Sequence, residues 1–182
     1  MGKFGFTGCL LAAVSVILLT AASPDRHYTL TGCRWPSGDI HYVNDSGPAY
    51  ETATAAAARR WMRGVSALRL QPAPMADWIV TTANLGPTNQ YGYTTWSCRD
   101  GQFLAVVSLY NVYYTDGFSF EQRVSVMTHE MGHALGLGHS LPGRRCPVAI
   151  MAANFSLTWG RCHESRPQAA DIEGLDSLYA GS

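Results

Sequence analysis

The sequence predicts an α+β domain, and three observations support this fold class. Short segments rich in β-branched and aromatic residues dominate residues 39–110 and enclose one Ala-rich helical stretch. After residue 119 the hydrophobic period changes to that of an α-helix, and a second helical pattern closes the chain. The chain has 182 residues, of which 47% are hydrophobic and 14% charged, so it can form one domain around one sizeable core.

The first part of the domain is predicted to alternate between strands and one helix. Residues 39–43 (DIHYV) alternate as in a strand, and the turn at 44–48 places Pro48 where a helix begins. The helix at 49–64 carries an apolar stripe with a spacing of four residues. The stripe consists of Ala53, Ala57, Trp61 and Val65. Further strands are expected at residues 68–70, 78–82, 91–96 and 103–110.

The second half is predicted to contain two helices separated by an irregular segment. An amphipathic helix of about 18 residues begins at Phe120 and ends at Gly136 and Gly138. Its apolar stripe is Phe120, Val124, Met127, Met131 and Leu135. Residues 140–164 show no sustained period and are expected to be irregular. A capping box of Ser165 and Gln168 is expected to start the last helix, at 167–179, which has Ile172, Leu175 and Tyr179 on one side.

Residues 1–22 have the features of a secretory signal peptide. Lys3 provides a positive start, and residues 10–20 contain no charge but are shorter than the roughly 20 residues that span a bilayer. Small residues near Ala22 form a cleavage context. The alternatives are a buried helix or a retained membrane anchor. We therefore expect a secreted, extracellular protein whose single domain is residues 23–182, with no membrane association after cleavage.

Charge and cysteine content narrow the possible partners and the compartment. Thirteen basic and thirteen acidic residues cancel, so no basic excess points to a nucleic-acid partner. Four cysteines remain after the signal segment, and an even number in a secreted chain predicts two disulfides. Of three possible pairings we favour Cys146–Cys162, where closing a short loop contributes roughly 3 kcal/mol, together with Cys33–Cys98. The competing role, a zinc ligand or an inhibitory thiol, lacks support from CxxC spacing.

The chemistry is concentrated at the end of the helix that begins at Phe120. His129 and His133 lie one helical turn apart, so both imidazoles can bind one zinc ion at about 2.0–2.1 Å. Glu130 lies one position further round, where it can reach a zinc-bound water. Gly136 permits a left-handed turn that brings His139 back as the third ligand. Three protein ligands leave a fourth position open, as catalytic zinc sites require.

These histidines have two alternative interpretations. They could be ordinary residues of a helix surface, or they could form a structural zinc site. A closed structural site needs four protein ligands. The spare candidates are His27, His41, His163 and the cysteines, and none has an informative spacing.

Residues 129–139 resemble the long zinc motif of the metzincin metallopeptidases. Met151, twelve residues after His139, resembles the methionine of the family's turn below the metal. Within the metzincins the chain is most similar to the matrixins, the matrix-metalloproteinase-like branch, because Ser140 follows the third histidine. Residues 34–42 also resemble the matrixin entry strand, and residues 168–179 resemble its C-terminal helix.

The resemblance implies a metzincin-like catalytic domain with a twisted mixed sheet of about five strands, an active-site helix, a second N-terminal helix and a C-terminal helix. It implies a zinc metalloendopeptidase with one catalytic Zn²⁺ held by His129, His133 and His139. Glu130 would be the general base that activates zinc-bound water, and Met151 would pack under the site.

The resemblance also suggests how substrate binds. An extended protein or peptide substrate would pair with an edge strand, for which we expect residues 102–107. A pocket beside the active-site helix would be lined by Phe155, Leu157 and Trp159, although alternating apolar residues are more often core. We expect the mature protein to be monomeric.

Some family features are missing from the sequence. Matrixins usually carry a long propeptide whose cysteine blocks the zinc, and since only a few residues separate the expected cleavage site from the first strand here, we expect this device to be absent unless Cys33 provides it. Calcium is possible at Asp100 and Asp116 but has no supporting motif, since both fit ordinary turns. Two alternatives to the peptidase are a non-catalytic secreted binding protein with this fold and a zinc hydrolase of another substrate. The intact Glu130 favours catalysis, because a binding module needs no base beside the metal.

Overall fold

The computed structural model describes residue 1 and residues 27–141, 143 and 145–181. The expected signal segment therefore lies outside the described residues, apart from Met1. A five-stranded mixed sheet forms the base of the domain, in the order β2-β1-β3-β5-β4. Its strands are β1 (Asp39–Asp45), β2 (Arg69–Pro72), β3 (Trp78–Ala83), β4 (Gly92–Arg99) and β5 (Gln102–Asn111). Only β4 runs antiparallel to its neighbour, so the predicted mixed sheet of about five strands is confirmed.

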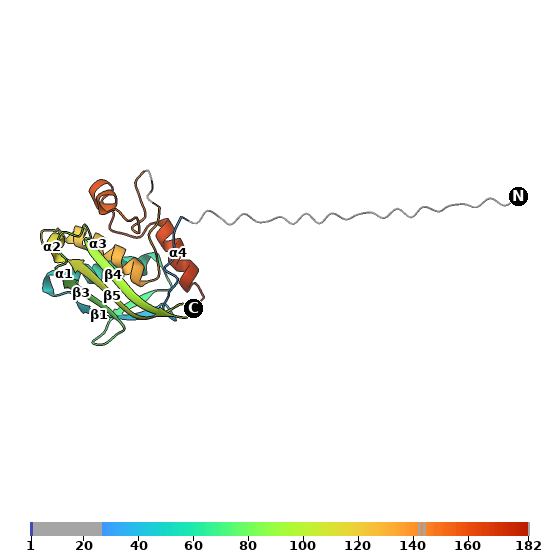
Figure 1. Ribbon diagram of the computed structural model, residues 1–182, viewed down its shortest axis with the longest axis horizontal. Coiled ribbons are helices and arrows are strands. Elements are labelled where there is room, and N and C mark those ends of the chain that lie inside the picture. Colours follow the sequence, from blue (N-terminus) through green and yellow to red (C-terminus); the bar gives the residue numbers. More distant parts are fainter. Residues whose placement is uncertain (2–26, 142, 144, 182) are drawn as a thin grey trace.

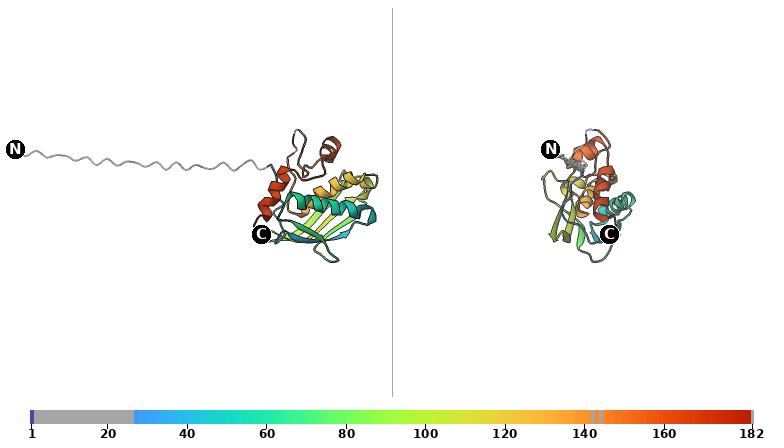
Figure 2. Two further views of the ribbon diagram at one scale, coloured as in Figure 1. Left: turned by 180° about the vertical axis from the view of Figure 1, so that it is seen from behind. Right: turned by 90° about the vertical axis from the view of Figure 1, so that its right-hand side faces the viewer.

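Helices cover one face of this sheet (Figures 1 and 2). The helices are α1 (Pro48–Gly64), α2 (Val112–Thr115), α3 (Phe120–Ala134) and α4 (Ala169–Tyr179). Helices α1 and α3 lie over the sheet, while α4 lies at one end of it. The segment expected to be irregular contains a π-helix, η1 (Ser156–Arg161), which the sequence analysis did not predict.

Small side chains let α1 approach α3 closely. Ala53, Ala57, Trp61 and Val65 are all buried, as the stripe predicted. The Trp61 indole Nε1 donates a hydrogen bond of 2.9 Å to the Thr128 carbonyl of α3. Contact with the backbone of α3 is possible because alanines replace bulky residues along this face. The helix that carries the candidate site therefore rests on a rigid partner.

Helix α3 buries its apolar stripe with one exception. Val124, Met127, Met131 and Leu135 are fully buried, whereas Phe120 is 48% exposed, contrary to the sequence expectation. Phe120 is the first residue of the helix, whose N-terminus is closed by a capping box of Ser119 and Gln122 that the sequence analysis missed. The apolar stripe is therefore buried from Val124 onward and not in the first turn of the helix.

The last helix begins two residues later than predicted. Its N-cap is Gln168, whose backbone N–H donates to the Asp171 carboxylate at 2.8 Å. Ser165 is therefore not the capping residue; its hydroxyl donates to Glu121 of α3 instead. Leu175 is fully buried, and so is Tyr179, whose hydroxyl donates to the Leu135 carbonyl. These contacts fix α4 against the end of α3.

The prediction that residues 102–107 form an edge strand is wrong, because the edge strand on this side of the sheet is β4. Strand β5, which contains that segment, lies between β3 and β4. The expectation failed because strand order depends on pairing between distant segments, and local alternation carries no information about it.

Two disulfides tie the surface segments to this framework. Cys33 bonds Cys98 and Cys146 bonds Cys162, which is the pairing favoured from the sequence. These cysteines are therefore neither zinc ligands nor a free inhibitory thiol. Among the described residues, no helix combines the length and hydropathy needed to cross a bilayer.

Candidate metal centre and active site

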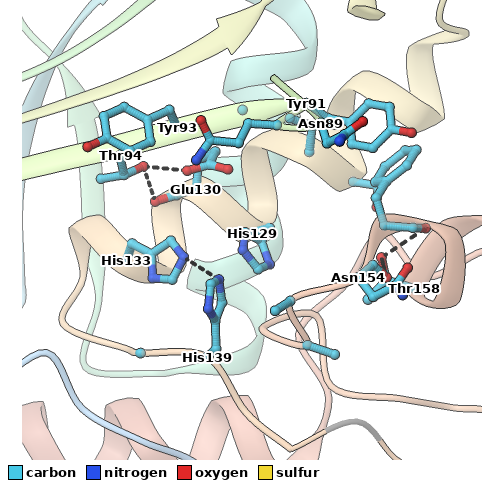
Figure 3. A pocket seen from close by; sticks show the side chains of 18 of the residues that line it. Asn89, Tyr91, Tyr93, Thr94, His129, Glu130, His133, His139, Asn154 and Thr158 are labelled. Carbon is cyan, nitrogen blue, oxygen red and sulfur yellow. Dashed lines mark hydrogen bonds between the residues drawn. The ribbon is translucent and has the colours of Figure 1, made fainter. Parts of the chain in front are cut away.

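Helix α3 and the turn after it bring three histidines together. His129 and His133 project from successive turns of the helix, toward His139 in the chain beyond it (Figure 3). Gly136 has a φ of 109°, and a Cβ at this position would lie 2.6 Å from the Cys33 carbonyl oxygen. Only glycine fits this turn, which reverses the chain and returns His139 to the helix.

Two of the imidazoles are oriented by backbone carbonyls. His129 Nδ1 lies 2.7 Å from the Ile150 carbonyl oxygen, and His133 Nδ1 lies 2.8 Å from that of Leu137. A carbonyl oxygen can only accept, so each Nδ1 carries the proton. Each neutral ring therefore presents the lone pair of its Nε2.

The arrangement of these nitrogens suits zinc. The potential ligand atoms of the three histidines all lie within 4.8 Å of one another. His133 Nε2 and His139 Nε2 are 3.2 Å apart, and two nitrogens bound to one tetrahedral zinc would be separated by about 3.3 Å. Burial lowers the pKa of His129 to about 3 and that of His133 to about 4, so both rings are neutral at pH 7. Neutral imidazole is the form that binds metal.

The segment before β1 holds the turn that carries His139. Thr31 donates its backbone N–H to the Gly136 carbonyl at 2.8 Å, and the Gly138 N–H donates to Thr29 at 2.9 Å. The Thr29 hydroxyl also donates to the His139 carbonyl at 2.6 Å. The third histidine is thus fixed by the N-terminal segment, a contact that the local motif did not reveal.

Glu130 is buried beside the histidines, with 5% of its surface exposed. Its Oε2 accepts a hydrogen bond of 2.7 Å from the Thr94 hydroxyl of β4. Burial raises the pKa of Glu130 to about 8, and the Thr94 bond opposes this shift. A divalent cation on the imidazoles would also favour the ionised carboxylate.

Met151 packs against α3 at Gly132, between the positions of His129 and His133 in the sequence. It is 1% exposed, and a Cβ on Gly132 would collide with its sulfur atom. The preceding residue, Ile150, supplies the carbonyl that orients His129. The Asp171 carboxylate accepts the N–H of Ile150 at 2.8 Å and that of Met151 at 3.2 Å. Helix α4 therefore holds the turn that positions the first histidine.

A cavity of about 790 Å³ opens over these residues. The side chains of α3 form its floor. Two walls face each other across the floor, and we name them by their lining residues. The strand wall consists of residues 91–94 and Trp96, and the loop wall consists of residues 152–156 and Thr158. Figure 3 shows Thr94 of the strand wall beside Glu130, with Asn154 and Thr158 on the other side.

The expected pocket residues are only partly in this cavity. Phe155 lines it and packs on Tyr91 of the strand wall, with ring centroids 4.6 Å apart. Leu157 and Trp159 are not among the lining residues that the structure describes. The π-helix turns them away, because a helical segment does not alternate as a strand does.

The other residues considered from the sequence lie elsewhere. His27, His41 and His163 are exposed, and none joins the histidine cluster found in the described part of the chain. Asp116 accepts a hydrogen bond of 2.6 Å from the Tyr50 hydroxyl, and Asp100 occupies a turn with a φ of 52°. Both therefore behave as turn residues in the structure.

Sequence reasoning missed the contributions of β4 to the site. It predicted a strand at residues 91–96 but gave no role to Gly92, Thr94 or Trp96. These three lie on one face of the strand, and all line the cavity. Tyr91 and Tyr93 line it as well, so no simple alternation in the sequence marks these residues, and only the strand order places Thr94 against Glu130.

Comparisons with known proteins agree with this geometry. The family model for matrixins matches residues 32–180. Two structures of myroilysin align with TM-scores of 0.54 and 0.56 at 15% and 14% identity; they cover 80% and 82% of this chain and 85% and 83% of theirs. High choriolytic enzyme 1, a hatching-enzyme zinc protease from Oryzias latipes, aligns at 16% identity over 81% of this chain and 94% of its own, with a TM-score of 0.49. No curated protein matches.

The two myroilysin structures have low identity and support the fold alone. The match to the family model is stronger evidence of family membership, because it spans most of the chain and includes the histidines, Glu130 and Met151. These residues form one site in the structure, with the donor set of a zinc centre. On this evidence the chain belongs to the matrixin family, a family of zinc metallopeptidases.

Proposed function

We propose that this chain is a secreted zinc endopeptidase that hydrolyses peptide bonds within proteins. One observation carries the proposal: a buried carboxylate, Glu130, follows directly on a histidine of a three-imidazole cluster that opens into a large cavity. His129, His133 and His139 would hold one zinc ion. When bound, zinc supplies Lewis-acid polarisation of the substrate carbonyl and stabilises the negative charge that develops on it.

The role of Glu130 follows from its place in the cavity. Its carboxylate takes the proton from the attacking water and then donates it to the leaving amine nitrogen. Burial raises the pKa of Glu130 and the cation would lower it, so the two effects oppose each other on the group that must both take and release a proton. Met151 supports the site from below, without contact with the substrate.

The substrate would bind as an extended strand. Strand β4 is an edge strand of the sheet and forms one wall of the cavity. A free strand edge offers backbone N–H and C=O groups to a peptide, and this mode recognises any sequence in extended form. A protein substrate is therefore a better fit than a compact small molecule.

Secretion is proposed from the N-terminal segment and from the disulfides. Two disulfides within one small domain are typical of proteins that fold in an oxidising compartment. Residues 23–182 would then act outside the cell as one catalytic domain.

The test is digestion of casein or gelatin by the zinc-loaded protein, with sequencing of the new chain ends. We expect cleavage that a chelator abolishes and added zinc restores. Glu130→Gln keeps the shape of the side chain but removes the base, so it should retain zinc and lose about 10²- to 10⁴-fold in kcat. Glu51→Gln, at an exposed position of α1, is the control. A Glu130→Gln variant with full activity contradicts the mechanism.

The alternative is a secreted binding protein that retains the fold but does not cleave. Such a protein would hold peptides in the cavity, and their ends would remain intact. Wild-type protein that binds casein with zinc present yet leaves it uncut favours this alternative.

A further inference from the structure

The Glu130 carboxylate is held by one hydroxyl group on the edge strand. Thr94 Oγ1 lies 2.7 Å from Glu130 Oε2, 3.1 Å from the Glu130 backbone oxygen and 3.2 Å from Ser108 Oγ. A threonine hydroxyl has one proton to donate. The carboxylate oxygen is the nearest acceptor, and a zinc ion on the imidazoles would keep it ionised, so it receives that proton. Figure 3 shows this bond from β4 to α3.

The other carboxylate oxygen has a different environment. Among the described residues, no hydrogen bond to Glu130 Oε1 is found, and Glu130 lines the cavity. A Cβ on Gly92 would lie 2.7 Å from this oxygen and 2.6 Å from Cγ of the same side chain. The missing side chain of Gly92 therefore leaves the space that the carboxylate occupies. One oxygen is bound to Thr94, and the other is free to meet water.

The position of Thr94 is itself fixed by the sheet. Thr94 is paired with Ser108 of β5 in the strand register and is 7% exposed. Ser108 Oγ accepts a hydrogen bond of 3.2 Å from Trp78 Nε1 of β3. Three neighbouring strands thus support the hydroxyl that reaches Glu130. Such support keeps a donor in place with little loss of entropy when it acts.

We propose that Thr94 is a positioning residue for the general base: its hydroxyl holds Glu130 Oε2, so that Oε1 faces the water that attacks the peptide bond. This inference rests on the proposed function. Glu130 takes a proton from water on Oε1 and releases it to the amine nitrogen when the C–N bond breaks. Thr94 donates to Oε2 throughout and transfers no proton itself.

The experiment compares three variants of the zinc-loaded protein on a fluorogenic peptide derived from a mapped cleavage site. Thr94→Val keeps the shape but removes the donor, so kcat should fall about ten- to a hundredfold, as expected for losing a hydrogen bond to a charged group. KM should stay within about twofold, since Thr94 acts through Glu130 and does not bind substrate. Thr94→Ser retains the hydroxyl and should recover most of kcat.

Two readouts separate positioning from a structural role. Thr81→Val removes another threonine hydroxyl bond, to the Asp45 carbonyl, and should leave kcat unchanged. Zinc affinity, measured by competition with a chelating dye, should be the same in all variants. Crystal structures should show the Glu130 carboxylate displaced in Thr94→Val and in place in Thr94→Ser.

Several results would contradict the role proposed for Thr94. An active wild type with an equally active Thr94→Val variant overturns the positioning role alone, and so does a Thr94→Ser variant as impaired as Thr94→Val. Loss of zinc from Thr94→Val also overturns it, because the defect would then be structural. A wild type that cleaves nothing overturns the proposed function, and this inference with it.

Discussion

The strand wall and the loop wall of the cavity face the same histidines, but they are built differently. Apart from Tyr91, the strand wall belongs to β4, which pairs with β5 along its length from Gly92–Tyr110 to Arg99–Gln102. The position of each residue in this strand is set by its partner in β5. No single contact is decisive for the shape of this wall.

The loop wall depends on a few isolated contacts. Asp171 of α4 binds the backbone just before it, and the Cys146–Cys162 disulfide encloses it. After the wall, the Ser165 carbonyl accepts a hydrogen bond of 2.6 Å from Arg60 of α1. Its own secondary structure is the short π-helix η1.

Because of this difference, we expect substitutions in the two walls to affect different properties of the protein. Changes on the strand wall act on the chemistry, because β4 keeps its place through many hydrogen bonds while individual side chains touch Glu130. Changes at the anchors of the loop wall act on stability, because each anchor joins the wall to a separate helix. Variants at each wall should therefore give opposite patterns of activity and stability.

The largest effect is expected from Gly92→Ala on the strand wall. A Cβ would meet Glu130 Cγ at 2.6 Å and Oε1 at 2.7 Å, so the base must leave its position. We expect kcat to fall by about 10²- to 10⁴-fold, the range for losing a general base. Thermal unfolding should shift little, because β4 remains paired with β5.

Gly117→Ala is the matched control for this variant, since nothing lies within 4 Å of a Cβ there. It should behave as the wild type in both assays. A Gly92→Ala variant with normal kcat would show that Glu130 does not need the space above Gly92.

The second-largest effect is expected from Asp171→Ala, at an anchor of the loop wall. The Asp171 carboxylate accepts backbone N–H groups from Ile150, Met151 and Gln168 at 2.8, 3.2 and 2.8 Å. Burial raises the pKa of Asp171, while these three bonds favour its ionised form. Removing the carboxylate leaves buried donors unsatisfied, so the free energy of unfolding should fall by about 3 kcal/mol.

Urea unfolding measures this loss, and Asp176→Ala, at an exposed position of the same helix, is its control. Where folded Asp171→Ala protein remains, its kcat should fall less than that of Gly92→Ala. The reverse order would contradict the division between the two walls.

The same division explains what could be predicted from the sequence. The strands, α1 and the stripe of α3 follow local periods, so they were predicted to within a few residues. The histidine motif could also be predicted from the sequence, because the helix period and one glycine turn determine how its residues lie relative to one another. Strand order, by contrast, depends on distant pairings, so β5 was mistaken for the edge and Thr94 was missed.

The loop wall was the least predictable part of the site. Its contacts join residues 150–151 to Asp171 and the end of the wall to Arg60, more than a hundred residues earlier in the chain. A π-helix has no sequence signal of its own. For this reason the alternation of Phe155, Leu157 and Trp159 suggested that all three line the pocket. In the structure only Phe155 is among the described lining residues.

The smallest effect is expected from Glu121→Gln, at the far anchor of the loop wall. Glu121 accepts two hydrogen bonds from Arg60, at 3.0 and 2.9 Å, and one of 3.0 Å from the Ser165 hydroxyl. Its side chain is 47% exposed. A partly exposed ion pair contributes only about 0.2–1 kcal/mol at neutral pH, which is the loss we expect in Glu121→Gln.

The pH dependence identifies the ion pair as the source of this loss. The hydrogen bond from Arg60 lowers the pKa of Glu121 below its ordinary value. For a carboxyl group with a lowered folded-state pKa, the stabilisation is present above the unfolded-state pKa and is lost as pH falls through the folded one. Urea unfolding at pH 7 and at successively lower pH should show wild type and Glu121→Gln converging below about pH 4. Glu173→Gln, an exposed position on α4, should show no such convergence. A gap between wild type and Glu121→Gln that persists in acid would mean that the amide disrupts packing, and that the loop wall does not depend on this charge.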